Sequence, residues 1–527
     1  MEPIDTPEHL LSSWSDSPLI TNVNVFTTVC IGVVLLLALT ALPHMRESSK
    51  LPYINPRRSL DVFRKNQKLD FLVNARKLME TARERFPGQP YRLMTDVGET
   101  VVLPPAFINE IRNQPDLSFV KAFAENFHPQ LPGFEGFAAG SREDGLFQLV
   151  IKKRITKLLN QITEPLAAEA QHAIDINFGK PTEWTEHAIK PTILDVVSRL
   201  SSRVFLGTEL CRHDPWLSIT KSYTVNAFVS AELLRPYPYH LRSVAQHFLP
   251  QCRTLRRQVA EARRIIAPVL DQRRALRARA RAAGEPVPKF NDGLDWFEEE
   301  ESKGQAYDAA DAQLGLSVVA IHTTTDLLVE TMLRIAQHPH LFAALRREVV
   351  DVLSADGWKK TALFNMKLMD SVLKEAQRLK PITSAVMMRV ATKPTTLPAG
   401  ITLRAGERCA ADLGGMLDPA VYPSPTTFDG RRFLAMRGDG ALDSQAHLVS
   451  TSPSHLGFGH GLHACPGRFF AANELKIALA HLVIKYDWKL TEGYEHRWEE
   501  YGFGWNSDSG AKLLMRRRVP EIDIDAL

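Results

Sequence analysis

Cysteine is scarce in this chain, and Gly/Ser-rich linkers and internal repeats are missing. The five cysteines are scattered, odd in number and without paired metal-ligand spacing: Cys30, Cys211, Cys252, Cys409 and Cys465. This pattern argues against a disulfide framework or a zinc cluster, and it fits a reducing, cytosol-facing environment. The missing linkers and repeats favour one large unit over several separate domains in the 527 residues.

A charge excess of either sign is also lacking. Lys and Arg number 64 against 60 Asp and Glu, so the formal net charge is only +4 and indicates no nucleic-acid partner. The apolar fraction of 44% and the charged fraction of 24% are ordinary for a globular protein. These fractions exclude a collagen-like or wholly disordered chain.

Near the N-terminus, residues 25–42 form an uncharged apolar run. As a helix this run would extend about 27 Å, close to the roughly 30 Å thickness of a bilayer core. Acidic residues precede it and basic residues follow it, which places the rest of the chain on the cytoplasmic side. We expect a lumenal N-terminus (1–24), a transmembrane anchor (25–42), a Pro-bearing hinge (43–58) and a catalytic domain (59–527). A cleaved signal peptide is the alternative, although its apolar region is usually shorter and follows a basic start.

Helical periodicity dominates the remaining sequence, so the predicted fold class is mainly α with minor β. The expected helices are 59–85, 146–177, 253–283, 311–337, 341–353, 366–380 and 468–485. Shorter runs typical of strands occur at 91–103, 386–405 and 512–517. Residues 253–281 are rich in arginine and fit an amphipathic surface helix with a solvated face; contact with a membrane surface is the alternative.

The most informative stretch surrounds Cys465. Gly459, Gly461 and Gly467 allow close backbone approach, and a helix that begins near Arg468 can direct its free N–H groups toward a thiolate. A thiolate can act as a nucleophile or as a metal ligand. No His or Asn is tied to this cysteine by spacing, and the glycines suit a flat ligand, so an axial ligand of haem iron is the better interpretation.

Residues 458–467 match in full the F-x-x-G-x-(R/H)-x-C-x-G haem-ligand loop, and the chain thereby resembles the cytochrome P450 family. The resemblance covers the whole chain, from the expected anchor to the order of the other motifs. It implies the cytochrome P450 fold and a heme b group whose iron is bound by Cys465. It also implies that the cofactor-binding residues include Phe458, Gly459, His463, Gly467 and Arg389.

Glu375 and Arg378 lie three residues apart, so on a helix their opposite charges can pair. Taken alone, this is a common surface pair. In this place before Cys465 it resembles the structural E-x-x-R pair of the family, with Arg432 as its third member. The family commonly has proline where Gly430 stands.

Three consecutive threonines occupy the interior of the expected helix 311–337, where β-branched residues are unfavourable. A locally hydrogen-bonded threonine cluster is one interpretation. The other is that they resemble the oxygen-activation groove A-G-x-(D/E)-T-T, with Thr324 as the key hydroxyl and Thr323 in place of the acid. Ile321 replaces the usual glycine. The variant A-I-H-T-T and the segment 291–296 resemble fungal secondary-metabolism enzymes, including the ent-kaurene oxidase type.

The resemblance also implies electron-transfer partners and an anionic cofactor. Arg389 and His463 match positions that commonly bind haem propionates, and a residue among Lys152, Lys153 and Arg154 could supply another cation. Electrons would come from NADPH through NADPH-cytochrome P450 reductase, with cytochrome b5 as a further donor. A cationic surface containing His460, Arg468, Lys476 and 152–154 could steer an acidic partner. The expected location is the endoplasmic reticulum membrane.

The expected reaction is monooxygenation of a hydrophobic terpenoid, indole-diterpenoid or polyketide intermediate in fungal secondary metabolism. The candidate substrate residues, which ordinary core packing would equally explain, are Phe127, Phe134, Phe137, Ser317, Ala320, Ile321, Ala385, Val386 and Met387. Segment 127–145 is expected to be a loop. The alternatives are a hydroperoxide-rearranging enzyme of the same fold and a non-catalytic membrane haem-binding protein.

Overall fold

The computed structural model describes residues 27, 32, 51–57, 61, 64–142, 144–301, 304 and 306–527. Almost all of the expected N-terminus, anchor and hinge (1–24, 25–42 and 43–58) lies outside the described residues. The chain separates into two compact units, Met1–Leu51 with Pro238–His240 and Pro52–Tyr237 with Leu241–Leu527. The second unit contains the helices, sheets and cavity described below.

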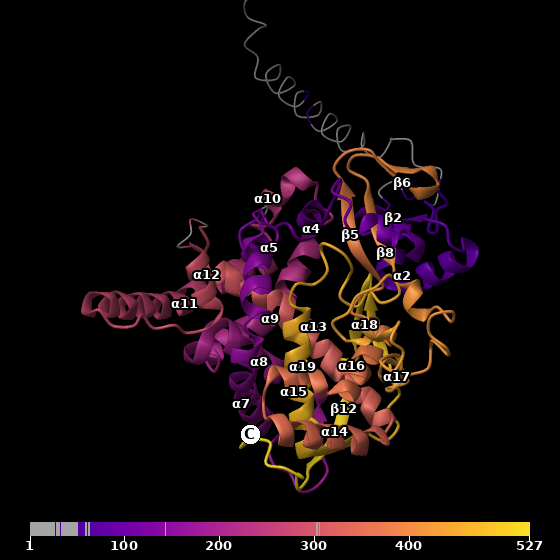
Figure 1. The fold of residues 1–527 in the computed structure, drawn as a ribbon. Helices are drawn as coiled ribbons and strands as arrows, with labels where there is room; N and C mark the ends of the chain where they lie inside the picture. Colours follow the sequence, from indigo (N-terminus) through magenta and orange to yellow (C-terminus); the bar gives the residue numbers. More distant parts are fainter. Residues whose placement is uncertain are drawn as a thin grey trace, which may run out of the picture. The chain divides into compact units, whose positions relative to one another are not determined.

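Helices make up most of the second unit, and the strands form smaller sheets (Figure 1). The predicted class, mainly α with minor β, is therefore confirmed. The principal helices are α2 (Lys65–Arg85), α4 (Phe119–Phe127), α5 (Glu135–Gly140), α6 (Leu146–Val150), α7 (Leu159–Phe178), α8 (Ile189–Leu210), α9 (Asp214–Leu234), α11 (Pro250–Ala283), α12 (Gly293–Glu301), α13 (Ala309–Gln337), α14 (Leu341–Asp356), α15 (Lys360–Asn365), α16 (Lys367–Leu379) and α19 (Arg468–Lys485). The shorter helices are α3 (Ile108–Ile111), α10 (Arg242–Ala245), α17 (Arg432–Met436) and α18 (Asp443–Ala446).

The largest sheet has the strand order β1-β2-β8-β5-β3. Its strands are β1 (Tyr91–Thr95), β2 (Gly98–Leu103), β3 (Leu117–Ser118), β5 (Ala385–Ala391) and β8 (Arg408–Asp412). Strand β2 pairs with β1 in an antiparallel hairpin and with β8 in parallel. A three-stranded sheet joins β4 (Thr185–Ala188), β12 (Lys512–Arg517) and β9 (Tyr486–Leu490). Two hairpins complete the set, β6 (Thr395–Leu397) with β7 (Ile401–Leu403) and β10 (Trp498–Tyr501) with β11 (Gly504–Ser507). Strands β2, β5, β6 and β8 lie together at the upper right of Figure 1, and β12 lies near its lower end.

Helix α19 begins and ends at the predicted residues, Arg468 and Lys485. The predicted helix 146–177 is divided into α6 and α7 by a π-helical turn over Ile151–Ile155, where the Thr156 N–H donates to the Ile151 carbonyl at 3.1 Å. The expectation of a loop over 127–145 is wrong in part, because α5 occupies its centre.

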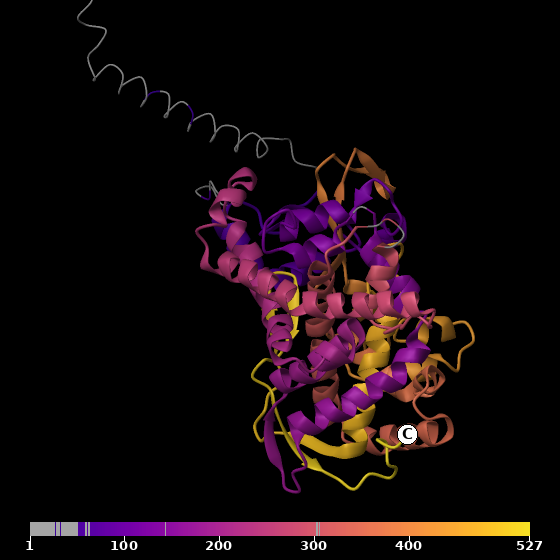
Figure 2. The same ribbon diagram turned by 90° about the vertical axis from the view of Figure 1, so that its left-hand side faces the viewer.

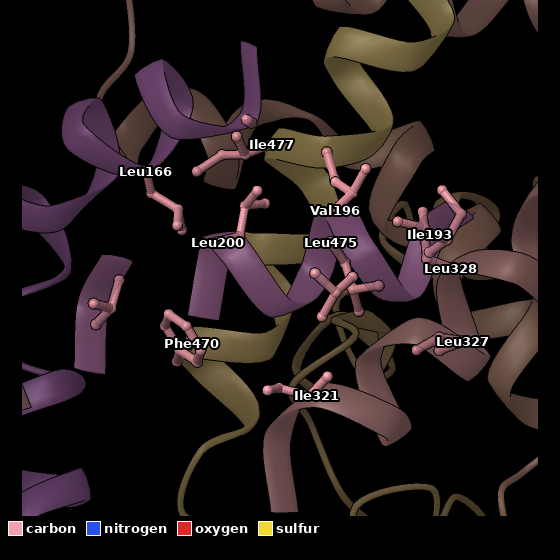
Figure 3. Packing of buried hydrophobic residues seen from close by; sticks show 14 of the residues in the cluster. Leu166, Ile193, Val196, Leu200, Ile321, Leu327, Leu328, Phe470, Leu475 and Ile477 are labelled. Atoms are coloured by element: carbon pink, nitrogen blue, oxygen red, sulfur yellow. The ribbon is translucent and has the colours of Figure 1, made fainter. Parts of the chain in front are cut away.

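Helices α8, α13 and α19 pack together in the core, and α19 passes through the middle of the helical region (Figures 1 and 2). Figure 3 shows their apolar side chains interleaved, with Leu200 from α8, Ile321 from α13 and Leu475 from α19 close to one another. Among the described helices, α13 is long and apolar enough to cross a membrane, yet 78% of its apolar window is buried within the protein. It is therefore a core helix, and it carries the threonine cluster into the interior.

Candidate active site

A cavity of about 670 Å³ lies between α13, α4, the start of β5 and the loop that precedes α19. Cys465 and Thr324 both line it. Several large apolar side chains are exposed only toward interior space of this kind; Val319 on α13 is 48% exposed and Ile382 40%. A cavity with apolar walls and few polar groups suits a hydrophobic ligand.

The loop that holds Cys465 is fixed by its backbone. The Cys465 N–H donates to the Phe458 carbonyl at 2.9 Å, and Gly461 has a φ of 83°. A Cβ atom at Gly461 would lie 2.5 Å from the Cβ of Arg112, so a side chain does not fit there. Tight packing at this glycine holds the loop against the residues that follow α3.

Burial raises the pKa of the Cys465 thiol, while the N–H groups of Gly467 and Arg468 and the charge of Arg468 act in the opposite direction. These N–H groups belong to the first turn of α19, whose positive dipole end also favours an anion. Cys211, Cys252 and Cys409 also have pKa values raised by burial. Of these cysteines, Cys465 is the one that lines the cavity.

Two cations and a histidine gather near this loop. His463 and Lys152 line the cavity, and Arg389, which is only 2% exposed, acts on His463. The pKa of His463 is lowered by burial and then by the charges of Arg389 and Lys152. Burial lowers the pKa of Arg389 to about 10. No carboxylate pairs with Arg389 in the described part of the chain; its guanidinium donates to the Met388 carbonyl at 2.8 Å and lies 5.7 Å from the Phe119 ring.

A buried, unpaired arginine is costly, so a cluster of cations beside a cavity fits an anionic ligand. The cavity wall contains a cysteine, glycines and apolar side chains, which suit the flat face of a porphyrin with its sulfur ligand. The residues present therefore fit a haem group. Cys465 would hold its iron, and Arg389, His463 and Lys152 would neutralise its carboxylates.

A bulge in β5 places Arg389. Val386 is paired with Ala411 and Arg389 with Cys409, although the two β5 residues are three apart in sequence and their partners only two. The extra residue therefore puts Val386 and Arg389 on one face of the sheet. Met387 takes a φ of 54° at this bulge. One strand thus supplies both an apolar wall of the cavity and the buried cation.

Glu375, Arg378 and Arg432 form one buried network. Arg378 donates two bonds of 2.8 Å to the Glu375 carboxylate, and Arg432 donates a third at 3.0 Å. Arg378 also donates to the carbonyls of Met416 and Pro425. The network fixes α16 to the segment between β8 and α17, and the structure brings together all three residues selected from the sequence.

On α13 the two selected threonines differ. The Thr323 hydroxyl donates to the Val319 carbonyl of its own helix at 2.9 Å, as in the alternative of a locally bonded cluster. The Thr324 hydroxyl instead lies beside the carboxyl of Glu474 on α19, where it favours the ionised form of that carboxyl and so opposes the rise of its pKa. Glu474 is fully buried and also accepts a bond of 2.8 Å from the Ser201 hydroxyl of α8. Sequence inspection missed Glu474 because a lone glutamate inside a helix carries no distinctive spacing.

The comparisons with known proteins agree with this site. The family model described as "Cytochrome P450" matches residues 147–509 of this chain. The chain belongs to the cytochrome P450 family. It is 45% identical over 480 residues to cytochrome P450 monooxygenase eqxH of Fusarium heterosporum, covering 90% of this chain and 92% of that protein. It is 42% identical over 494 residues to cytochrome P450 monooxygenase hepE of Aspergillus oryzae, covering 93% and 90%.

Among solved structures, the cytochrome P450DA heme domain aligns with a TM-score of 0.65 at 15% identity, covering 89% of this chain and 98% of that one. This likeness shows the cytochrome P450 fold. The family match and the fungal relatives identify the enzyme as a P450 monooxygenase. The family works with a haem-thiolate centre, dioxygen and a reductase.

Of the candidate substrate residues, Ala320 and Val386 line the P450 cavity. The other candidates are not among the described residues that line the cavity: Phe127, Phe134, Phe137, Ser317, Ile321, Ala385 and Met387. Phe127 and Phe137 stack at 4.6 Å in an aromatic cluster, and the wall is formed instead by their neighbour Phe123. Phe123 and Phe127 lie one turn apart on the same face of α4, so their height along the helix decides which of them reaches the cavity, and the sequence does not reveal it.

The residues expected to steer an electron-transfer partner have other contacts. Lys476 is only 5% exposed and pairs with Asp370 at 2.5 Å, so the prediction that it attracts a partner is wrong. Arg468 donates to the carbonyls of Cys465 and Val449, and Arg154 pairs with Glu299 at 2.6 Å. His460 lies between Arg112 and Thr451.

Proposed function

We propose that this P450 inserts one oxygen atom into a hydrophobic intermediate of fungal secondary metabolism. A terpenoid, an indole-diterpenoid or a polyketide is the substrate class, in keeping with the resemblance to the ent-kaurene oxidase type. The observation that carries the proposal is the apolar cavity in which Val319, Phe123 and Ile382 lie with Thr324 and Cys465. The enzyme acts at the endoplasmic reticulum membrane through an anchor over 25–42.

The overall reaction converts substrate, dioxygen, NADPH and a proton into hydroxylated product, water and NADP⁺. When bound, the haem supplies dioxygen activation, and its thiolate ligand favours O–O cleavage. Cys465 provides that sulfur, which the first turn of α19 stabilises as an anion. Arg389, His463 and Lys152 bind the carboxylates of the group.

The other residues of the site bind the substrate and handle protons. Leu316, Val319 and Ala320 on α13 offer an apolar face against which a hydrocarbon skeleton can lie. Thr324 is the hydroxyl from which protons pass to dioxygen during its reduction. Electrons enter from NADPH through the reductase, with cytochrome b5 as a further donor.

The first experiment tests the sulfur ligand. Membranes containing the wild-type protein, reduced and treated with carbon monoxide, should show the red-shifted absorption band of a thiolate-bound haem. Cys465→Ser should lose this band, whereas Cys252→Ser, at another buried cysteine, should keep it. An imidazole-type band in the wild type would remove Cys465 from its proposed role.

The second experiment tests the reaction. Reductase, NADPH and a panel of terpenoid, indole-diterpenoid and polyketide precursors are incubated with the enzyme under air and under nitrogen. Products that gain one oxygen atom, detected by mass, should form only under air. A product that forms equally under nitrogen would instead assign the enzyme to the hydroperoxide-rearranging type.

A further inference from the structure

The P450 cavity has no free acid among the described residues that line it. Asp326 is the one carboxylate in that lining, and both of its oxygens are occupied. Its Oδ1 atom accepts bonds from the Ser507 N–H and hydroxyl at 2.7 and 2.9 Å, and its Oδ2 atom pairs with Lys380. With both oxygens engaged in this way, Asp326 has no free oxygen to present to Thr324.

Position 323 does not supply an acid either. Its threonine hydroxyl bonds to the carbonyls of Val319 and Ala320, at 2.9 and 3.2 Å. Thr324 therefore faces the cavity beside no acid with a free oxygen, since Asp326, the nearest acid on its helix, is engaged by Ser507 and Lys380. A threonine hydroxyl is itself too weak an acid to replace a lost proton, so another donor must stand behind it.

Glu474 is placed to be that donor. It lies on α19, outside the cavity wall, and its carboxyl lies beside the Thr324 hydroxyl. The helices around it contribute to the apolar core, in which Figure 3 shows Leu475 of α19, Ile321 of α13 and Leu200 of α8. The side chain is 0% exposed, and no ion pair reaches it in the described part of the chain.

The two oxygens of Glu474 are not equivalent. Oε1 accepts the bond from Ser201, whereas Oε2 is buried without a well-formed hydrogen bond among the described residues. A proton on Oε2 completes the arrangement, because Oε2–H can then donate to Thr324 Oγ1. The Thr324 hydroxyl proton is thereby left free to point into the cavity. Burial raises the pKa of Glu474 to about 8, so the carboxyl is mostly protonated near neutral pH.

We propose that Glu474 is a positioning residue that supplies protons through Thr324 during dioxygen reduction. The Oε2–H bond breaks as its proton passes to Thr324 Oγ1, while the Thr324 hydroxyl proton passes to the dioxygen being reduced. The electrons come from NADPH through the reductase. Water returns the proton to Glu474 between turnovers. Ser201 holds Oε1 and thereby keeps the donating oxygen toward Thr324.

The test measures how completely oxygen is reduced, and it needs no known substrate. Dioxygen that receives two electrons and two protons leaves as hydrogen peroxide, whereas cleavage of the O–O bond consumes four of each and yields water. Holoenzyme, reductase and NADPH are mixed in air, and the peroxide released per NADPH consumed is determined. Glu474→Gln keeps the size and the Ser201 bond but has no acidic proton.

We expect Glu474→Gln to raise the peroxide fraction several-fold, to the level of Thr324→Val, and the double variant to rise no further. Glu348→Gln is the matched control, because Glu348 is a largely buried carboxyl of α14 that accepts the N–H groups of Leu368 and Met369, away from the cavity. Its peroxide fraction should equal that of the wild type. A value for Glu474→Gln at the control level, or an additive double variant, would overturn the proposal.

A second readout does not depend on turnover. Infrared spectra at neutral pH should contain the carbonyl stretch of a protonated carboxylic acid, missing in Glu474→Gln and shifted in Thr324→Val. The carbon monoxide spectrum confirms that each variant retains its haem. If Glu474→Gln does not bind haem, the shift of the infrared carbonyl band in Thr324→Val alone tests whether the carboxyl contacts Thr324. An unshifted band would show that the carboxyl does not bond to Thr324.

Discussion

Two buried glutamates of this P450, Glu474 and Glu375, differ in the charges around them. Glu474 is surrounded by hydrocarbon, and no opposite charge stabilises its ionised form. Glu375 is equally buried, but Arg378 and Arg432 hold its charge. The same residue type therefore serves as a proton carrier in one place and as a structural anchor in the other, because its neighbours differ.

The environment of Glu474 predicts a pH-dependent stability. Its folded pKa, about 8, lies above its ordinary value of 4.5, so the folded state binds the proton more tightly than the unfolded state. The stability from this proton is complete below pH 4.5 and is lost as the pH rises toward 8. Urea unfolding measures this effect. Between pH 5 and pH 8 the free energy of unfolding of the wild type should fall by on the order of a few kcal/mol relative to that of Glu474→Gln.

The control for this pH series is Glu186→Gln on strand β4, where the carboxylate is exposed and pairs with Lys512 at 2.7 Å. The difference in the free energy of unfolding between Glu186→Gln and wild type should stay constant over the same pH range, since an exposed ion pair contributes little to stability. A Glu474→Gln difference that is also constant would mean that the carboxyl has the same pKa in the folded and unfolded states.

At the scale of helices and strands, segments beside the recognised motifs were the easiest to predict. Helix α19 follows the glycine-rich loop and has the predicted bounds, and α13 and α14 agree within three residues at each end. Helices α8 and α9 were not identified. Helix α8 is buried on most of its surface, including Ser198, Ser201 and Ser202, so its sequence lacks the polar face that reveals a surface helix.

The arginine-rich helix α11 is the predicted amphipathic surface helix, with Arg253, Arg257 and Arg264 exposed, but not all of its arginines face solvent. Its arginines were assigned to a solvated face or to a membrane surface, but several pair with the acidic helix α12. Arg274 and Arg277 pair with Glu298, and Arg273 is only 2% exposed, paired with Asp292 at 2.6 Å. Helix α12 follows α11 closely in the sequence, but the opposite charges of the two helices meet only because the chain turns back between them. The segment 291–296 is therefore a structural cap on α11.

This cluster depends on Gly207 near the end of α8. Gly207 has φ 75° and ψ −165°, and a Cβ atom there would lie 2.3 Å from the Asp292 carboxylate and 2.8 Å from Arg273 Nη2. We expect Gly207→Ala to lower the free energy of unfolding by about 3 kcal/mol or more, from backbone strain and from the disturbed buried ion pair. Urea denaturation of the holoenzyme measures the loss.

Gly284, after α11, offers the matched comparison. It also has a positive φ, 69°, but a Cβ atom there would meet no other atom within 4 Å. Gly284→Ala should cost only about 1 kcal/mol, from the backbone conformation alone. If both substitutions cost the same, the Arg273–Asp292 pair does not constrain Gly207.

At the scale of the whole molecule, the sequence located the chemistry better than the substrate. Cys465, Thr324 and Arg389 belong to local patterns, and the structure gathers them around one cavity or beside it. The walls of that cavity depend on which side of each helix faces inward and on the bulge at Met387. Local sequence does not encode either feature, which is why Val319 was missed. It also does not show how far along α4 the cavity extends, so Phe127 was chosen in place of Phe123, one turn earlier on the same face.

Folding and cofactor binding are coupled in this P450 through its unpaired buried charge. Arg389 has no carboxylate partner among the described residues, so the chain without haem carries a cost that the propionates of the bound group offset. Arg389→Met removes the charge and keeps an apolar stem of similar length. It should stabilise the apoprotein by about 2 kcal/mol, yet it should make haem loss about tenfold faster.

Denaturant unfolding of both forms, together with transfer of haem to apomyoglobin, measures these opposite effects. Arg408→Met is the contrasting variant, since Arg408 is also buried but donates to Glu125 and Asn126, each at 2.5 Å. Its loss should destabilise the apoprotein and the holoenzyme alike, because it leaves paired groups unsatisfied. An apoprotein destabilised by Arg389→Met would mean that this arginine holds the fold itself; only an effect of opposite sign in the two forms assigns its charge to the cofactor.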